Sequence, residues 1–301
     1  MTIKQLTAIA TDKTKFKTLS NFCDFAERYL EYASSKLQAV IISQNENHYQ
    51  FFQYKKDGGY QITRPINSRL MCTIADFSAL KKRIIGNLKE IRSFKSQEDR
   101  MGINKIVYTL QMSIGSTLDA LPAGKSNTAR KINGDLFEHL IRLVIREIGI
   151  SCESGVAQVP VLVGGKEQFR MSYQHDLIVK NFGKIKLIGS IKTSSKDRLD
   201  KIFIDKFLYS KLTDTTTPYV AVFLNDVQRK NTKTKNKYGI NATFLPGHFR
   251  AYTVKLNSLD GVYYCDIRPN MLTEEILKDS IKTFDYLLCE DIWEFLKRTH
   301  R

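Results

Sequence analysis

The sequence contains few residues that could build a metal site from nitrogen and sulfur ligands. Its five histidines are dispersed, and no two cysteines stand in a Cys-x-x-Cys spacing. The cysteines are scattered and odd in number: Cys23, Cys72, Cys152, Cys265 and Cys289. This distribution argues against a zinc site and against a disulfide framework. Nothing at the N-terminus resembles a signal peptide, so we expect a reduced, intracellular protein.

Long hydrophobic runs, internal repeats and low-complexity tracts are absent as well. No apolar run approaches the ~20 residues that a membrane-spanning helix requires, and no basic amphipathic helix dominates the chain. We therefore expect no membrane attachment. With 301 residues and 42% hydrophobic content, the chain can bury a large core in one or two domains.

Acidic residues are in the minority. The chain has 31 Asp and Glu against 47 Lys and Arg, which gives a formal net charge of +16 and a sequence pI near 9.5. A surface with this charge attracts polyanions. Nucleic acid is the simplest partner, because neutralising phosphates and releasing their counterions supplies much of the binding free energy.

The residues that could carry chemistry gather between positions 175 and 198. Asp176 opens a short apolar run, residues 181–184 read as a turn, and a returning strand ends at Lys192. Both side chains then lie near the strand ends away from the turn, where they can converge. Hydrolysis of a phosphodiester needs a carboxylate that holds a divalent metal, a cation near the phosphate and an activated water. Asp176 and Lys192 could supply the carboxylate and the cation.

An acid on one strand, a lysine at the end of the next and a helix beyond resemble the PD-(D/E)XK nucleases. Where that family commonly has an acid two residues before the lysine, this sequence has Ser190. The same acid is missing from the EcoRII and NgoMIV group of restriction endonucleases, which cut sites containing CCGG or CCNGG, and a carboxylate on the following helix replaces it. Asp205, 13 residues after Lys192, matches that position, although the usual residue is Glu. A solvated helix acid is the alternative interpretation of Asp205.

A charged triplet begins four residues after Lys192, formed by Lys196, Asp197 and Arg198. In the resembled group, a basic, acidic, Arg triplet at this spacing reads C:G pairs. Arginine or lysine donates to guanine, and the carboxylate accepts from cytosine. A solvated charged loop is the alternative interpretation.

A further acid comes from an amphipathic helix predicted over residues 133–149. Gly134, Phe137 and Glu138 match a Gly-x-x-Phe-Glu phrase whose glutamate joins the metal shell in the resembled family. A surface acid is the alternative interpretation of Glu138. His175, where the family often has proline, could touch a phosphate or pack in the core, and packing is favoured.

The resemblance implies an α/β fold with a central mixed β-sheet flanked by helices. We expect this nuclease core over residues 106–301, after an α+β region of residues 1–105 that serves DNA contact or dimerisation. The implied catalytic residues are Asp176, Lys192, Asp205, Glu138 and Ser190. Mg2+ would be held by Asp176, Asp205 and Glu138, and DNA would be read by Lys196, Asp197 and Arg198.

The implied activity is that of a type II site-specific deoxyribonuclease acting on double-stranded DNA at a palindrome. Because a palindrome has two equivalent strands, a homodimer or homotetramer is expected. The resemblance also implies a prokaryotic cytoplasmic location and a cognate DNA methyltransferase that acts on the same site without a stable complex. It covers residues 130–210. The alternatives are another PD-(D/E)XK nuclease, for repair or DNA mobility, and a non-catalytic DNA-binding protein that would explain the charge.

Three other segments give local predictions. Residues 158–163 and 169–173 read as strands joined by a glycine turn. Residues 225–238 are basic and contain almost nothing apolar, which predicts a mobile loop facing DNA or solvent. The aromatic residues of the strand at 49–54 could stack on a flipped base, although alternate strand positions are more often core.

Overall fold

The structure is a computed structural model of the 301-residue chain, and it describes residues 1–56, 59–196, 198–234 and 237–298. The chain divides into two compact units. The first contains residues 1–88, 95–143 and 227–243, and the second contains residues 89–94, 144–226 and 244–301. This division differs from the boundary expected at residue 105, because residues 106–143 and 227–243 group with the N-terminal region.

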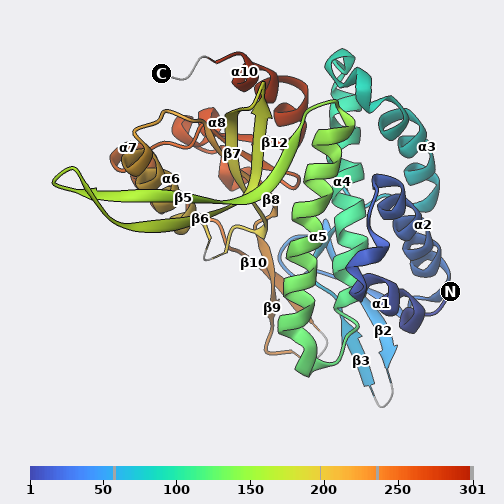
Figure 1. Cartoon of the computed structure of the whole chain (residues 1–301). Helices are drawn as coiled ribbons and strands as arrows, with labels where there is room; N and C mark the ends of the chain where they lie inside the picture. Colours follow the sequence, from blue (N-terminus) through green and yellow to red (C-terminus); the bar gives the residue numbers. More distant parts are fainter. Residues whose placement is uncertain (57–58, 197, 235–236, 299–301) are drawn as a thin grey trace. The chain divides into compact units, whose positions relative to one another are not determined.

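The first unit combines helices with a small antiparallel sheet (Figure 1). Its helices are α1 (Ile3–Thr11), η1 (Lys13–Lys15), α2 (Leu19–Lys36), α3 (Ile74–Ile84), α4 (Gln97–Leu118) and η3 (Ala123–Lys125), while η2 (Ile85–Ser93) and α5 (Ser126–Glu147) continue into the second unit. Its main sheet contains β1 (Ala39–Ile42), β2 (Tyr49–Lys56), β3 (Gly59–Ile62) and β4 (Ile66–Asn67). Tyr49, Phe51 and Tyr54 of β2 are buried. The core interpretation of these aromatics is therefore confirmed, and they do not present a face to a base.

The segment after residue 225 is a β-hairpin, so the prediction of a mobile loop was wrong. β9 (Val227–Asn231) pairs antiparallel with β10 (Tyr238–Ala242). Val227 and Ile240 pack against Tyr49 and Phe51 of β2. The few apolar residues of the hairpin bury their side chains against a strand that is distant in the sequence. The composition of the segment itself cannot indicate such packing.

The second unit is built on one mixed sheet of six strands, in the order β12-β11-β8-β7-β6-β5 (Figure 1). The strands are β5 (Cys152–Val163), β6 (Lys166–Asn181), β7 (Lys184–Ser194), β8 (Tyr219–Asn225), β11 (Gly261–Tyr264) and β12 (Ile281–Thr283). β5, β6 and β7 are antiparallel neighbours, whereas β7, β8, β11 and β12 are parallel. The helices are α6 (Leu199–Thr213), α7 (Pro246–Lys255), η4 (Pro269–Leu272), α8 (Glu275–Ser280), α9 (Phe284–Tyr286), η5 (Leu287–Asp291) and α10 (Ile292–Lys297). The expected mixed sheet flanked by helices is thus confirmed.

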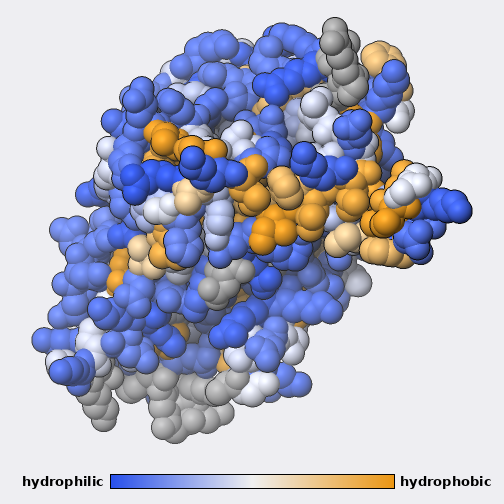
Figure 2. Space-filling model, turned by 90° about the vertical axis from the view of Figure 1, so that its left-hand side faces the viewer, coloured by the Kyte–Doolittle hydropathy of each residue, from blue (hydrophilic) through white to orange (hydrophobic). Residues whose placement is uncertain are grey.

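Two tight turns shape the antiparallel half of this sheet. Gly164 and Gly165 have φ of 60° and 77° and join β5 to β6, while Phe182 and Gly183 have φ of 48° and 76° and join β6 to β7. The strand expected at residues 169–173 is not separate, because β6 runs without a break from Lys166 to Asn181. Beyond β7, the strands β5 and β6 continue as a two-stranded hairpin that projects from the sheet (Figure 1). Figure 2 views the side toward which this hairpin projects, and a band of hydrophobic atoms is exposed there.

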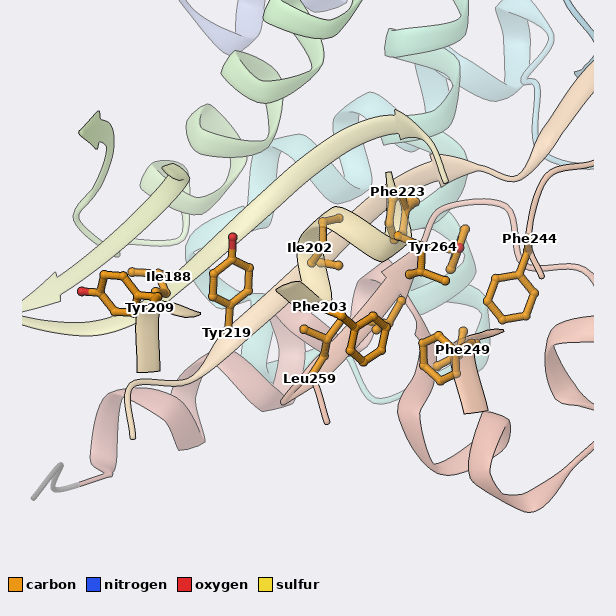
Figure 3. Close-up of a cluster of buried hydrophobic side chains, with 14 of the residues drawn as sticks. Ile188, Ile202, Phe203, Tyr209, Tyr219, Phe223, Phe244, Phe249, Leu259 and Tyr264 are labelled. Atoms are coloured by element: carbon orange, nitrogen blue, oxygen red, sulfur yellow. The ribbon is translucent and has the colours of Figure 1, made fainter. Parts of the chain in front are cut away.

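A hydrophobic cluster fixes α6 and α7 against the sheet (Figure 3). Ile202 and Phe203 of α6 and Phe249 of α7 pack with Ile188 and Phe223, which come from β7 and β8. The ring of Phe203 meets that of Phe249 edge-on, with centroids 5.6 Å apart. This packing holds the start of α6 close to the end of β7.

Two further observations bear on the composition of the chain. Among the helices that the structure describes, none is long and apolar enough to cross a membrane. All five cysteines are buried.

Candidate active site

Asp176 and Lys192 lie on the neighbouring strands β6 and β7 and are in direct contact. Leu177 pairs with Gly189 in the antiparallel register, which brings Asp176 beside the end of β7. Asp176 Oδ2 accepts a hydrogen bond from the backbone N–H of Ile191 at 2.9 Å and another from Lys192 Nζ at 2.5 Å. The Asp176 side chain is 9% exposed and that of Lys192 is 29% exposed. The predicted convergence of the acid and the lysine is therefore present at a nearly buried position.

A β-bulge places Asp176 there. Glu153 of β5 pairs with Ile178, and Gly155 pairs with His175, so β5 advances two residues while β6 advances three. The extra residue in β6 interrupts the alternation of side chains between the two faces of the sheet, as bulges near functional sites often do. As a result, His175 and Asp176 are both buried, at 1% and 7% exposure, although they are consecutive in a strand.

His175 sits in an aromatic enclosure. Its ring stacks with Tyr173 and meets Tyr209 and Tyr219 edge-on, with centroid separations of 6.4, 5.1 and 6.0 Å. Within the described part of the chain, neither ring nitrogen has a hydrogen-bond partner. Burial lowers the pKa of His175, against the opposing charges of Asp205 and Asp176. Its burial among aromatic rings confirms the packing interpretation of His175.

Ser190, two residues before Lys192, lies in the same buried region. Its Oγ lies 3.0 Å from the hydroxyl of Tyr219, the first residue of β8. Ser190 is 7% exposed and Tyr219 is 1% exposed. Burial raises the pKa of Tyr219, and the charges of Asp205 and Asp176 raise it further. The phenol therefore stays protonated and can donate to the serine or accept from it.

Asp205 lies on α6, and its charge acts on the same group of residues. Tyr173, His175 and Tyr219 all experience the Asp205 carboxylate. The side chain is 23% exposed and forms an i, i+4 ion pair with Lys201. Asp205 is accordingly neither fully solvated nor fully buried. Its charge acts on His175 from the helix, as the charge of Asp176 acts on it from the strand.

The charged triplet lies between β7 and α6. Lys196 and Arg198 are exposed, whereas Ser195 before them is only 2% exposed. The backbone N–H of Lys196 donates to Ser194 Oγ, and that of Arg198 donates to the Ser195 carbonyl at the start of α6. Asp197 lies outside the described residues. A buried serine thus anchors a short segment whose basic side chains are open to solvent.

Glu138 lies on α5 within the first unit and is half-buried. The buried stripe predicted for this helix is present, since Phe137, Leu140, Ile141 and Ile145 are fully buried. Gly149 follows the helix with φ of 88°, a left-handed conformation in which glycine commonly ends a helix. The participation of Glu138 in the site remains a prediction.

The carboxylates suit a hard divalent cation. Across the described residues, no three His, Cys, Asp or Glu side chains come together as a ready-made metal cluster. Mg2+ does not need such a cluster, because it usually binds one or two carboxylates and keeps water or phosphate oxygens for its other positions. Asp176 and Asp205, whose charges both act on His175, are the carboxylates that could donate oxygen ligands to such a cation.

Two polar residues near this site were not predicted from the sequence. Tyr219 contacts Ser190 through its hydroxyl, and nothing in the sequence next to Tyr219 indicates this contact. Asp226 is fully buried and follows β8, beside the β7 end where Ser194 pairs with Asn225. Burial raises the pKa of Asp226 to about 6, although Arg268 favours its ionised form. An acid placed directly after a buried strand is the signal that could have identified it.

No family model and no curated protein sequence matches the chain. Among solved structures, it is similar to the type IIP restriction endonuclease Kpn2I, with a TM-score of 0.70 and 18% sequence identity over 98% of this chain and 97% of that chain. It is also similar to the restriction endonuclease PspGI in a complex with substrate DNA, with a TM-score of 0.47 and 12% identity over 74% of this chain and 92% of that chain. The likeness to Kpn2I extends over nearly the whole of both chains. The chain therefore has the fold of the PD-(D/E)XK restriction endonucleases.

Proposed function

We propose that the protein is a type II restriction endonuclease that hydrolyses double-stranded DNA with Mg2+ at a palindromic site containing CCGG or CCNGG. The observation that carries this proposal is the contact between Asp176 and Lys192 at the end of two converging strands. The likeness of the whole fold to the restriction endonuclease Kpn2I supports it, and so does the net charge of +16. Ser190 in place of an acid, with Asp205 on the next helix, favours the EcoRII and NgoMIV group.

In this proposal, Asp176 and Asp205 hold Mg2+, with Glu138 completing the shell directly or through water. When bound, Mg2+ lowers the pKa of a coordinated water and neutralises charge on the phosphate. Lys192 keeps an ammonium group beside Asp176, where it orients the attacking water or stabilises the phosphate. The product would carry a 5′-phosphate.

Recognition would come from the exposed segment after β7. Lys196 and Arg198 would donate to guanine O6 and N7, and Asp197 would accept from cytosine N4. This segment follows Lys192 directly in the chain. Correct base contacts would then set the position of the scissile phosphate relative to the lysine. Two copies of the chain would present one site to each strand of the palindrome.

The test is to incubate the protein with DNA of mixed sequence and Mg2+. We expect discrete fragments whose sequenced ends reveal one palindromic site, and we expect EDTA to abolish cutting. Random degradation would instead assign a nonspecific nuclease. Retention of DNA without cutting would assign a binding protein.

Lys192→Ala tests the proposed site directly. Removing the ammonium group should reduce cleavage by at least ~100-fold, since positioned charges of this kind carry a large share of catalysis. Lys180→Ala is the matched control, because Lys180 lies on β6 but pairs with Glu153 at the surface. Cleavage by Lys192→Ala at the rate of the control would show that the chemistry lies elsewhere.

A further inference from the structure

The projecting part of the β5–β6 hairpin, residues 156–174, has one apolar face and one polar face. Three cross-strand pairs share the first face: Ala157 with Tyr173, Val159 with Met171, and Val161 with Phe169. Three pairs share the second: Val156 with Gln174, Gln158 with Ser172, and Pro160 with Arg170. Directly opposed side chains in an antiparallel pair lie on the same side of the sheet. The three pairs of the first face contain no charged residue, and we call the surface formed by these six side chains the hairpin face.

The hairpin face is buried near the sheet and exposed farther out. Val159 and Tyr173 are 4% and 5% exposed and belong to the core cluster of the second unit. Met171 and Phe169 are 36% and 57% exposed. At the tip, the register shifts after Val161, and the exposed Leu162 and Val163 pair with the charged Glu167 and Lys166, so the hairpin face ends at the Val161–Phe169 pair. One apolar surface thus continues from the core into solvent, where Figure 2 shows a band of hydrophobic atoms.

The backbone of the hairpin is also open to a partner. β5 is the last strand of its sheet, and residues 166–174 of β6 pair with β5 alone among the described strands. An apolar strand edge of this kind is a template for pairing with another chain. Exposed apolar patches on a soluble protein mark interaction surfaces.

The charge of the hairpin indicates what kind of partner it accepts. Residues 156–174 contain Lys166, Glu167 and Arg170, so the local sum is +1 − 1 + 1 = +1, whereas the whole chain carries +16. Glu167 pairs with Arg170 within the hairpin. DNA, which is held by phosphate contacts, has no cationic row to bind on the hairpin face. Two copies of a strongly basic protein, in contrast, repel each other least where charge is low.

We propose that the hairpin face is a dimerisation surface, on which two copies of this chain pack their β5–β6 hairpins against each other about a two-fold axis. Such an interface is self-complementary, because the same apolar residues meet from both sides. β6 also carries Asp176, seven residues after Phe169. Pairing of the hairpins would therefore fix the two Asp176 side chains relative to each other. The dimer proposal rests on the proposed function in one respect only: two copies of the chain would supply one active site for each strand of the palindrome.

Sedimentation velocity of the full chain, without DNA or Mg2+, tests the interface separately from nuclease activity. We compare Phe169→Glu/Met171→Glu on the hairpin face with the control Gln158→Glu/Gln174→Glu, which makes the same charge change on the polar face. We expect the wild type and the control to be dimers. The hairpin-face variant should have a dimer dissociation constant raised by at least ~100-fold, because two apolar side chains per copy lose their burial. A wild type that stays monomeric at every soluble concentration, or equal dimerisation of both variants, would overturn the proposal.

A second measurement covers the case in which the charged variant fails to fold. Phe169→Cys keeps the hairpin face apolar, and the native cysteines are buried. A short bis-maleimide should link two copies through this cysteine in much higher yield than through Gln158→Cys on the polar face. Equal yields would contradict packing of the two hairpin faces. If the wild type floats with neutral phosphatidylcholine vesicles and Phe169→Glu/Met171→Glu does not, the face binds lipid and the dimer proposal falls.

Discussion

Ser190→Asp offers a sharp test of the site, because it restores the acid that PD-(D/E)XK nucleases commonly carry two residues before the lysine. The new carboxylate would enter a buried region, since Ser190 is 7% exposed and lies 3.0 Å from the Tyr219 hydroxyl. Asp176 is close in the same site, so the charge would be disfavoured unless a cation is present. Ser190→Asn is the matched control, because asparagine has nearly the same shape and no charge.

The expected difference in stability between the two variants follows from the burial of the new carboxylate. Leaving a charge uncompensated in a protein interior costs about 3–5 kcal/mol. We expect the lower part of that range, because Lys192 is on the same strand two residues away and can partly screen the carboxylate. In EDTA, the free energy of unfolding of Ser190→Asp should therefore be about 3 kcal/mol lower than that of Ser190→Asn. If Mg2+ binds here, a free concentration of ~100 times its dissociation constant should return about 2.7 kcal/mol.

The assay is equilibrium urea denaturation of both variants, with EDTA and with Mg2+. We expect Mg2+ to raise the free energy of unfolding of Ser190→Asp much more than that of Ser190→Asn. Equal Mg2+ stabilisation of the two variants would refute the placement of Ser190 beside a metal. A Ser190→Asp variant as stable as Ser190→Asn in EDTA would refute the buried, charge-intolerant environment.

Three other predictions concern the same sheet and the segment after it. Burial raises the pKa of Asp226 from 3.8 to about 6, so the native state retains this proton while the unfolded chain has lost it. The stabilisation that the protonated acid gives the native state is fully present below pH 3.8. The free energy of unfolding should fall by about 3 kcal/mol as the pH rises through 6. In urea denaturation at a series of pH values, Asp226→Asn should not show this fall. A variant with the same pH profile as the wild type would contradict the role of Asp226. Gly189→Ala should destabilise by about 2 kcal/mol, because a Cβ would lie 2.9 Å from a Val220 methyl and 3.0 Å from its carbonyl oxygen. Gly247→Ala, where nothing lies within 4 Å, is the control in thermal unfolding, and equal losses would contradict the clash. Arg198→Ala should reduce discrimination between the cut site and a site with one altered C:G pair by about 1–3 kcal/mol in competition binding, and an unchanged preference would remove its reading role.

Local patterns were sufficient for the elements whose signals repeat within a few residues. The buried stripe of α5 follows from apolar residues at helical spacing, and Leu140, Ile141 and Ile145 are indeed buried. The turn at Phe182 and Gly183 separates two apolar strands, so the pairing of β6 with β7 could be predicted from the chain alone. Asp176 and Lys192 then had to lie near each other, because both stand at the open end of that hairpin.

Features that depend on distant partners were not predictable in this way. β9 and β10 form because Val227 and Ile240 bury their side chains on β2, which a reading of their own basic segment cannot reveal. The bulge that buries His175 and Asp176 together arises from the register between β5 and β6. The contact of Ser190 with Tyr219 requires the parallel pairing of β7 and β8.

The sequence by itself therefore determined which residues could form the site and which hairpin carries them, because periodicity and turn chemistry act over short distances. Only the tertiary structure decided how those residues are presented. It buried Asp176 against Lys192, enclosed His175 among three tyrosines, and brought Asp205 to the same enclosure from α6. It also extended β5 and β6 beyond the core, which left one apolar face exposed. These outcomes depend on strand register and on packing between distant segments, and neither is encoded in any single stretch of the chain.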